Sequence, residues 1–425
     1  MGNFLVGAAT SAHQVEGYNT NADCWIMENA PGTMWKEPSG AGVDHYNRFR
    51  EDIDYLADEG LNTYRFTIEW ARVQPEEGKF EESAFKHYQE VIEYCIEKGV
   101  VPIVTLHHFS TPAWVIKKGG WKSETTVIDF AAYCRAVMQR LGEKLTYVCT
   151  INEANMGLQM MKVMQQYAEA AQREGADNSI QIGMNMEEMM KNMEVYQKAV
   201  SEVFGRPDIN TFLDQRSAEE EVLVMKAHEA ARKAIKEVRP NIKVGLTLSL
   251  FDYQVNPGGE KLAEKFWQED FGIYFPYMQE DDFIGVQNYT RKIIGPEGPV
   301  VPENARLTEA GYEFYPQAVA NVVRRVNSVW GKEIIVTENG VSTSDDAKRI
   351  EFISTALEGI GECIKDGIPV TGYCYWSLLD NFEWQLGYGQ KYGLISVDRA
   401  TMERTVKPSL HTLGEAYGRM NKVKM

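Results

Sequence analysis

The chain alternates between two patterns of hydrophobic and polar positions. Short runs rich in β-branched and aromatic residues recur, and each run ends in polar residues. We predict a buried strand in each of these runs, which lie at residues 4–10, 62–70, 100–109, 145–153, 242–250, 282–290, 332–340 and 368–376. Amphipathic stretches separate most of them. Residues 85–99 are typical, because Phe85, Tyr88 and Ile92 share one helical face and Gly99 favours a C-terminal stop.

Eight strands that alternate with helices predict a closed (β/α)8 barrel, the TIM-barrel fold of the α/β class. Continuous apolar strands need a sheet covered on both faces, and crossover helices make such a sheet parallel. No Pro-, Gly- or Ser-rich linker and no change of composition divides the chain, so we expect one catalytic domain over residues 1–425. In such barrels the functional site lies at the carboxyl ends of the strands.

Composition and charge narrow the class of protein. Hydrophobic residues make up 44% and charged residues 25%, the balance of a globular protein with a large core. The formal net charge is −17 and no cluster of Lys and Arg interrupts it, so nucleic acid is not an expected partner. The six cysteines are widely spaced, which favours buried thiols in a reducing compartment. No secretory signal or membrane span is recognisable, so we expect a cytoplasmic protein without a membrane partner, and no motif sets an oligomeric state.

Two glutamates stand at the ends of predicted strands, each directly after or within a β-favouring run. Glu153 follows the fourth strand in "TINEAN", and Glu338 ends the seventh in "VTENG". In an eight-stranded barrel these strands lie on opposite parts of the ring, so the two side chains project toward each other across the mouth. Cleavage of a glycosidic bond needs such a pair: one carboxyl protonates the leaving oxygen, and the other attacks the anomeric carbon or orients water. Either glutamate alone is more often a salt-bridge or capping partner.

The segments around these glutamates combine aromatic rings with polar groups, as sugar-binding sites do. They are "SAHQVEG" from Ser11, "YRFTIEWARVQP" from Tyr64, "TLHHFSTPAW" from Thr105 and "YWSLLDNFEWQLGYGQKYGLISVD" from Tyr375. In their order along nearly the whole chain, these motifs resemble glycoside hydrolase family 1, the retaining β-glucosidase family. The resemblance implies a (β/α)8 barrel and a small-molecule β-glycoside substrate, with no cofactor.

The resemblance also implies roles for individual residues. Glu338 corresponds to the nucleophile and Glu153 to the general acid and base, while Arg72 and Tyr289 match positions that contact the nucleophile. Asn152 matches the amide that holds the sugar 2-hydroxyl, and Trp376 matches the ring beneath the sugar. The contacts to the 3-, 4- and 6-hydroxyls correspond to Gln14, His108, Glu383 and Trp384.

The chain departs from the family pattern at several positions. Ala154 replaces the proline after the acid, and Gln287 replaces an asparagine, which puts the contact of that amide in question. On the aglycone side, Tyr312 stands where the family commonly has tryptophan, beside Phe109. Residues 156–193 carry nine of the 18 methionines. These methionines are either filling helix cores or forming an adaptable apolar wall at the site entrance. Together the changes favour an apolar or aryl aglycone over cellobiose.

Other readings remain open at the level of sequence. The same residues fit a β-galactosidase, a β-fucosidase or a transglycosylase, and a carbohydrate-binding barrel without turnover is a further alternative that the intact glutamate pair disfavours. A phosphorylated sugar is disfavoured because the carboxylate of Glu383 would repel a 6-phosphate. His107 and His108 do not indicate a metal, since adjacent strand residues point to opposite faces and no further ligand cluster accompanies them.

Overall fold

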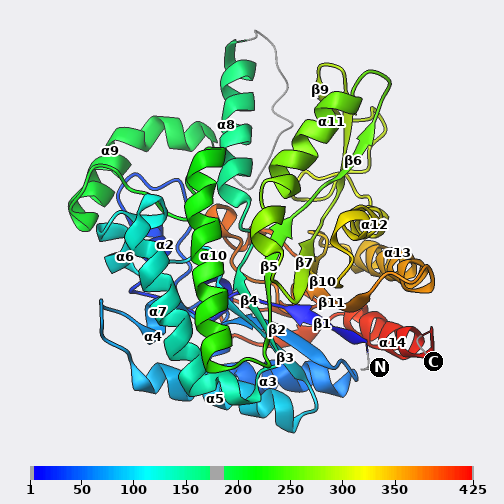
Figure 1. Cartoon of the computed structure of the whole chain (residues 1–425), viewed down its shortest axis with the longest axis horizontal. Helices are drawn as coiled ribbons and strands as arrows, with labels where there is room; N and C mark the ends of the chain where they lie inside the picture. The colour runs from blue at the N-terminus through cyan, green and yellow to red at the C-terminus, as the bar shows by residue number, and fades with distance from the viewer. Residues whose placement is uncertain (1–3, 173–185, 424–425) are drawn as a thin grey trace.

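The computed structural model describes residues 4–172 and 186–423 and contains a closed barrel of eight parallel strands (Figure 1). Each barrel strand falls inside one of the eight predicted runs, and its neighbours follow the chain order around the ring. The prediction of a (β/α)8 barrel is therefore confirmed. The strands are β1 (Leu5–Ala9), β2 (Thr63–Thr67), β3 (Val101–His107), β4 (Tyr147–Ile151), β5 (Lys243–Ser249), β7 (Phe283–Gln287), β10 (Glu333–Asn339) and β11 (Val370–Trp376).

Helices surround this barrel. The long ones that follow its strands are α3 (His45–Asp58), α5 (Glu82–Glu97), α7 (Glu124–Leu141), α10 (Ala218–Val238), α12 (Ala318–Trp330), α13 (Asp346–Lys365) and α14 (Pro408–Val423). The stretch predicted at residues 85–99 is α5, which begins earlier because the Glu81 side chain accepts a hydrogen bond from the Ser83 amide and caps the first turn. It ends as expected, with Gly99 at φ +74°.

The remaining elements lie in the connections. The further helices are α1 (Ala12–Val15), α2 (Asp23–Glu28), α4 (Trp70–Val73), α6 (Ala113–Lys117), α8 (Met156–Gln172), α9 (Met186–Phe204) and α11 (Glu260–Trp267). Short 3-10 or π turns occupy Gly120–Lys122, Gly142–Lys144, Gln268–Gly272, Phe275–Met278 and Trp384–Gly389. Two small sheets are formed by β6 (Asp252–Val255), β8 (Arg291–Gly295) and β9 (Gly298–Val300), and by β12 (Ile395–Val397) and β13 (Arg404–Val406).

The two faces of the barrel strands bury different side chains. Successive strand residues point to opposite faces, so Leu5 and Cys149 pack inside the barrel while the neighbouring Val6 and Val148 pack outward with residues of the helices. All six cysteines are buried and unpaired, which confirms their reading as small hydrophobic residues. The interior is thus filled below the strand ends, and side chains at the carboxyl ends are left to form a site.

One connection extends far from the barrel. Between β4 and β5 the chain forms α8, which projects from one side of the molecule, and α9, which packs against α2 and α6 (Figure 1). The methionine-rich segment lies here, and its residues 173–185 fall outside the described residues.

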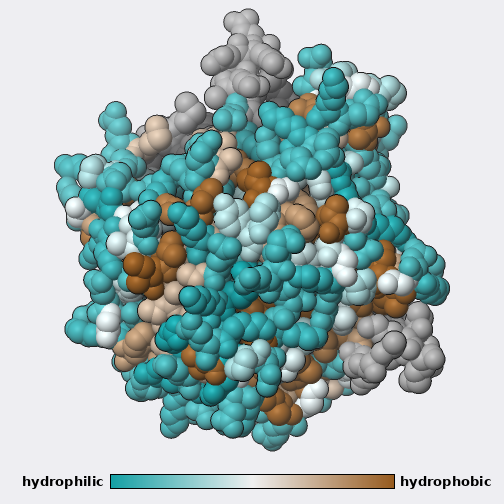
Figure 2. Space-filling model, in the orientation of Figure 1, coloured by the Kyte–Doolittle hydropathy of each residue, from teal (hydrophilic) through white to brown (hydrophobic). Residues whose placement is uncertain are grey.

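The surface agrees with the acidic composition. The face in Figure 2 is mostly hydrophilic, and its apolar residues are scattered in small groups. Within the described ranges, none of the helices combines the length and apolar character needed to cross a membrane.

Candidate active site

The carboxyl ends of the barrel strands surround a cavity of about 330 Å³. Glu153 and Glu338, which end the fourth and seventh barrel strands, both line it, as the sequence predicts. Glu338 belongs to β10 itself. Glu153 lies two residues beyond β4, where a positive φ of 42° turns the chain and its amide donates to Thr247 Oγ1 at 2.9 Å. The fold therefore brings the two carboxyls into one cavity from different parts of the ring.

Both carboxylate oxygens of Glu338 are held by hydrogen bonds. Arg65 Nη1 donates to Oε1 at 2.6 Å, and the Tyr289 hydroxyl donates to Oε2 at 2.6 Å. Arg65 is fully buried on β2, so its charge is little screened by solvent. Burial raises the pKa of Glu338 most, while the charge of Arg65 and the hydrogen bond from Tyr289 lower it. These two partners favour the ionised form of Glu338.

Glu153 has the opposite environment. Its side chain is buried, and no ion pair to it occurs in the part of the chain that the structure describes. Burial raises the pKa of Glu153 well above its ordinary value, and the negative charge of Glu338 raises it further. Of the two glutamates, Glu338 is therefore the one that ionises first, and Glu153 keeps its proton. Two facing carboxyls, one ionised and one protonated, can act as a nucleophile and an acid.

The predicted contact of Arg72 with Glu338 is wrong. Arg72 lies beyond the strand, on α4, and its Nε pairs with Glu16 at 2.7 Å while another nitrogen donates to the Gly17 carbonyl. Arg65 takes the predicted place. A signal for it exists in the sequence, because Arg65 occupies an inward position of β2, where a cation needs a buried anion as its partner.

Asn152 lies fully buried beneath the cavity and connects several site residues. Its Oδ1 accepts from Arg65 Nη2 at 2.5 Å and from Gln287 Nε2 at 2.7 Å. Gln287 thus reaches the same network despite its additional methylene. Asn152 Nδ2 donates to His108 Nε2 at 3.3 Å, which places the ring proton of neutral His108 on Nδ1. His108 Nδ1 is buried and makes no hydrogen bond to another described residue. Because His108 lines the cavity, this nitrogen is free to donate to a ligand there.

Gln14 and Glu383 meet at the edge of the cavity. Gln14 Nε2 donates to Glu383 Oε2 at 3.3 Å and to the Phe382 carbonyl at 2.7 Å, and Ser11 Oγ donates to its Oε1 at 2.7 Å. Burial and the negative charge of Glu338 raise the pKa of Glu383 to about 8. Glu383 therefore carries a proton near neutral pH and can both donate and accept a hydrogen bond.

The raised pKa of Glu383 predicts a pH-dependent effect of Glu383→Gln on stability. Between its ordinary value of 4.5 and about 8, the unfolded chain releases this proton while the folded chain keeps it. The free energy of unfolding therefore falls as the pH rises, by at most about 1.4 kcal/mol per pH unit. Glutamine does not titrate, so the Tm of Glu383→Gln should gain on wild type between about pH 5 and pH 8. A difference in Tm between Glu383→Gln and wild type that stays constant with pH would contradict the assignment.

Aromatic rings enclose the deep end of the cavity. Trp376, at the end of β11, stacks on His108 with ring centres 5.6 Å apart. The ring centre of Trp384 lies 6.5 Å from that of His108, in a stacked arrangement, and 5.4 Å from that of Phe109. Tyr392, which the sequence analysis did not single out, is buried and also lines the cavity. These rings suit the apolar faces of a sugar.

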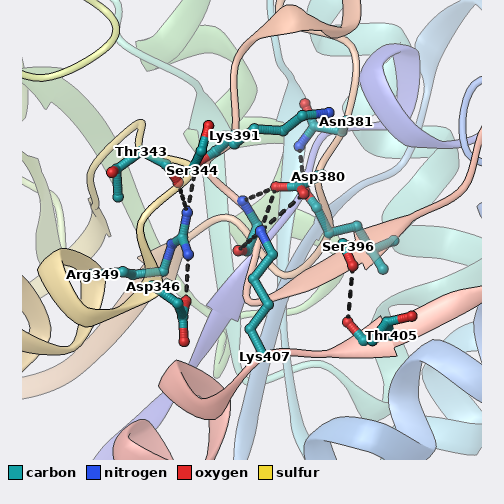
Figure 3. Close-up of polar contacts among 12 residues, drawn as sticks. Thr343, Ser344, Asp346, Arg349, Asp380, Asn381, Lys391, Ser396, Thr405 and Lys407 are labelled. Carbon is teal, nitrogen blue, oxygen red and sulfur yellow. Dashed lines mark hydrogen bonds and ion pairs between the residues drawn. The ribbon is translucent and has the colours of Figure 1, made fainter.

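The segment that carries Glu383 and Trp384 is anchored by charged groups (Figure 3). Lys407 Nζ donates to both carboxylate oxygens of Asp380 at 2.9 Å and to the Gly393 carbonyl at 2.8 Å. Fully buried Arg349 donates to the Lys391 carbonyl at 2.7 Å. Figure 3 shows Lys407 beside Asp380 and Arg349 near Lys391. They fix the loop after β11 and thereby the two side chains that it presents to the cavity.

The outer part of the cavity is largely apolar. Tyr312 and Phe109 line it, as do Met156, Met160 and Met164 of α8. For these three methionines the structure favours an apolar wall over simple core filling. Met193 of α9 is exposed, and the methionines at 184–190 lie outside the residues whose side chains the structure describes.

Three kinds of comparison place this chain among known proteins. The family model of glycosyl hydrolase family 1 matches residues 1–418. The chain is 27% identical to the 1,4-beta-D-glucan glucohydrolase of Thermotoga neapolitana, with 96% of this chain and 95% of that protein covered.

Solved structures are similar over the same length. The crystal structure of the beta-glycosidase BGL167 is 40% identical, with a TM-score of 0.86 over 98% of this chain and 96% of that one. The apo structure of a beta-glucosidase designated 1317 is 34% identical, with a TM-score of 0.87 over 98% of both chains.

Proposed function

Since the chain belongs to glycosyl hydrolase family 1 and is a glycoside hydrolase, we propose that it releases terminal β-D-glucosyl residues through a covalent intermediate on Glu338. The observation that carries this proposal is the unequal environment of the two carboxyls in one cavity. Arg65 and Tyr289 hold both oxygens of Glu338, whereas Glu153 is buried without a cationic partner among the described residues.

The first step of the proposed reaction forms a glycosyl ester. Ionised Glu338 attacks the anomeric carbon while Glu153 transfers its proton to the glycosidic oxygen, so the alcohol leaves neutral. The ester then removes the negative charge of Glu338. The charge of Glu338 raises the pKa of Glu153, so its loss lowers that pKa. Glu153, which has just given up its proton, can therefore stay ionised and act as a base. Glu153 next takes a proton from water, which attacks the same carbon and restores Glu338.

The sugar contacts follow from groups that are free in the cavity. Trp376 supplies an apolar face, and His108 Nδ1 and protonated Glu383 can hydrogen-bond the hydroxyls. Further sugar contacts are proposed for Asn152, Gln14, Trp384 and Tyr289. Asn152 is assigned to the 2-hydroxyl. Glucose, rather than a 4-epimer, is the proposed sugar because beta-glucosidases recur among the relatives.

We also propose that residues 1–425 form a single catalytic domain. The barrel closes only when β1, near the start of the chain, pairs with β11, near its end. A cut at an internal boundary would therefore open the barrel and separate Arg65 from Glu338.

The apolar outer cavity predicts a preference for apolar aglycones. We expect octyl β-D-glucoside to exceed cellobiose in kcat/KM by at least about tenfold, because burial of its alkyl chain contributes about 25 cal/mol per Å² and both substrates release an alcohol. Met160→Gln should reduce this preference. Exposed Met193→Gln on α9 is the matched control and should preserve it. A kcat/KM for cellobiose that clearly exceeds the value for octyl glucoside would refute the aglycone assignment.

A further inference from the structure

Several polar groups that line the cavity take no part in the proposed reaction. Tyr196 on α9 and Asp214 on the connection between α9 and α10 are two of them. Both belong to the long connection between β4 and β5, whereas Glu338 and Glu383 come from the barrel strand β10 and the loop after β11. In the proposed function the aglycone lies against α8, and Tyr196 and Asp214 belong to the same connection as α8.

The Tyr196 side chain is fixed in position but lacks a hydrogen-bond partner. The residue is only 9% exposed, and its ring packs with Ile116, Val200 and Phe204. Its buried hydroxyl makes no hydrogen bond to any other residue in the described ranges. Buried polar atoms are usually paired, so an unpaired hydroxyl on a cavity wall indicates a partner that enters with a ligand.

Asp214 presents a fixed carboxylate in the wall of the same cavity. Its Oδ2 accepts from the Thr211 amide at 2.6 Å and from the Thr211 hydroxyl at 3.0 Å. The other carboxylate oxygen of Asp214, Oδ1, accepts no hydrogen bond from any residue that the structure describes. The negative charge of Asp214 also raises the pKa of the Tyr196 phenol, after the larger effect of burial. Burial raises the pKa of Asp214 itself, while the hydrogen bonds from Thr211 and the charges of Arg216 and Lys122 lower it. Neither of these two cations lines the cavity.

The chemistry of the pair selects one kind of ligand group. A hydroxyl can donate to the Asp214 carboxylate and accept from the Tyr196 hydroxyl at the same time. An ammonium group could donate to the Asp214 carboxylate and to the Tyr196 oxygen, but it would leave the Tyr196 proton without an acceptor. An anionic group would be repelled by Asp214. We propose that Asp214 and Tyr196 bind a hydroxyl group on an otherwise apolar aglycone. This inference rests on the proposed function and narrows its substrate class to glycosides of hydroxylated apolar alcohols or phenols.

Matched biaryl glucosides test the proposal. The parent is biphenyl-4-yl β-D-glucoside, and its 3′-hydroxy and 4′-hydroxy derivatives carry a hydroxyl on the distal ring, where the leaving oxygen is little affected. A hydrogen bond to a charged group changes binding by about tenfold or more. In wild type we expect at least one hydroxylated glucoside to exceed the parent in kcat/KM by about tenfold.

Variants assign this preference to the two residues. Tyr196→Phe and Asp214→Ala should each reduce the ratio of hydroxylated to parent substrate below about threefold. Because both substrates are measured on the same protein, partial misfolding cancels from the ratio. Asp208→Ala is the matched control, since Asp208 lies on the same connection, pairs with Arg206 and does not line the cavity.

Two outcomes overturn the proposal: a ratio below threefold for both hydroxylated glucosides in wild type, or a preference that persists in Tyr196→Phe and Asp214→Ala. Hydrolysis of the parent separates this failure from failure of the proposed function. If the parent is cleaved and Glu338→Ala abolishes that cleavage, only the assignment of Asp214 and Tyr196 has failed. If wild type cleaves no β-glucoside, the proposed function itself has failed.

Discussion

Glu338→Ala is expected to reduce hydrolysis of p-nitrophenyl β-D-glucoside by at least about four orders of magnitude, because the substitution removes the nucleophile. Stopped assays of released nitrophenol measure this loss. Arg65 and Tyr289 should still hold the sugar pocket open, since Arg65 is fully buried on β2 and Tyr289 is half-buried after β7.

Azide provides a sharper result with the same variant. The alanine leaves a space that the small anion can enter, next to the cation of Arg65. Azide should restore cleavage and yield the α-glucosyl azide, because it attacks from the side that Glu338 occupied. Glu338→Gln is the matched control, since its amide fills the space and should prevent rescue. Formation of the β-azide from Glu338→Ala, or near-normal activity without azide, would contradict the role of Glu338.

Replacement of Glu153 should have an effect that depends on the leaving group. For phenyl β-D-glucoside, Glu153→Ala is expected to lower kcat/KM by about 10² to 10⁴-fold, because the departing phenolate is no longer protonated. For 2,4-dinitrophenyl β-D-glucoside, which needs little protonation, kcat/KM should change far less. A plot of log kcat/KM against the pKa of the leaving phenol measures this difference as a steeper slope in the variant.

Two further observations apply to Glu153→Ala. The limb of the pH–kcat/KM profile that reports the raised pKa of Glu153 should disappear. Azide should accelerate the second step and yield the β-glucosyl azide, because it enters from the face on which Glu153 acts. Glu153→Gln keeps the shape of the side chain without the proton and should show the same dependence on the leaving group. An equal loss for all leaving groups would show that Glu153 is not the acid.

The strands and the two glutamates could be predicted from sequence because their signals are local. A run such as residues 332–340 has β-favouring residues and a polar end, and the ring geometry of eight such runs brings Glu153 and Glu338 together. For the cationic partner of Glu338, the sequence predicts the wrong arginine. Arg72 lies in a short helix after the strand and turns to Glu16, whereas Arg65 shares the inward face of β2 with Thr63 and Thr67. The two-residue period of a strand indicates that Arg65, and not Arg72, faces the barrel interior.

The outer cavity could not be predicted in the same way. Tyr196 and Asp214 lie in an insertion without the barrel period. The packing of α9 against α2 and α6 brings Tyr196 to the cavity wall, and hydrogen bonds from Thr211 hold Asp214 there. Their sequence neighbours form no motif. The polarity of the aglycone pocket therefore depends on long-range packing, while the position of the glutamates depends on strand ends.

Trapping of the covalent intermediate tests the central claim most directly. The protein is incubated with 2,4-dinitrophenyl 2-deoxy-2-fluoro-β-D-glucoside, and the digested product is analysed by tandem mass spectrometry. The fluorine slows both steps, while the dinitrophenolate leaving group keeps the first step fast, so the ester accumulates. A burst of one dinitrophenol per protein molecule and a fluoroglucosyl ester on Glu338 are the predicted results. A stable ester on another residue, or steady hydrolysis of unmodified glucosides to the α-anomer without any ester, would contradict the assignment of Glu338 as the residue that carries the sugar.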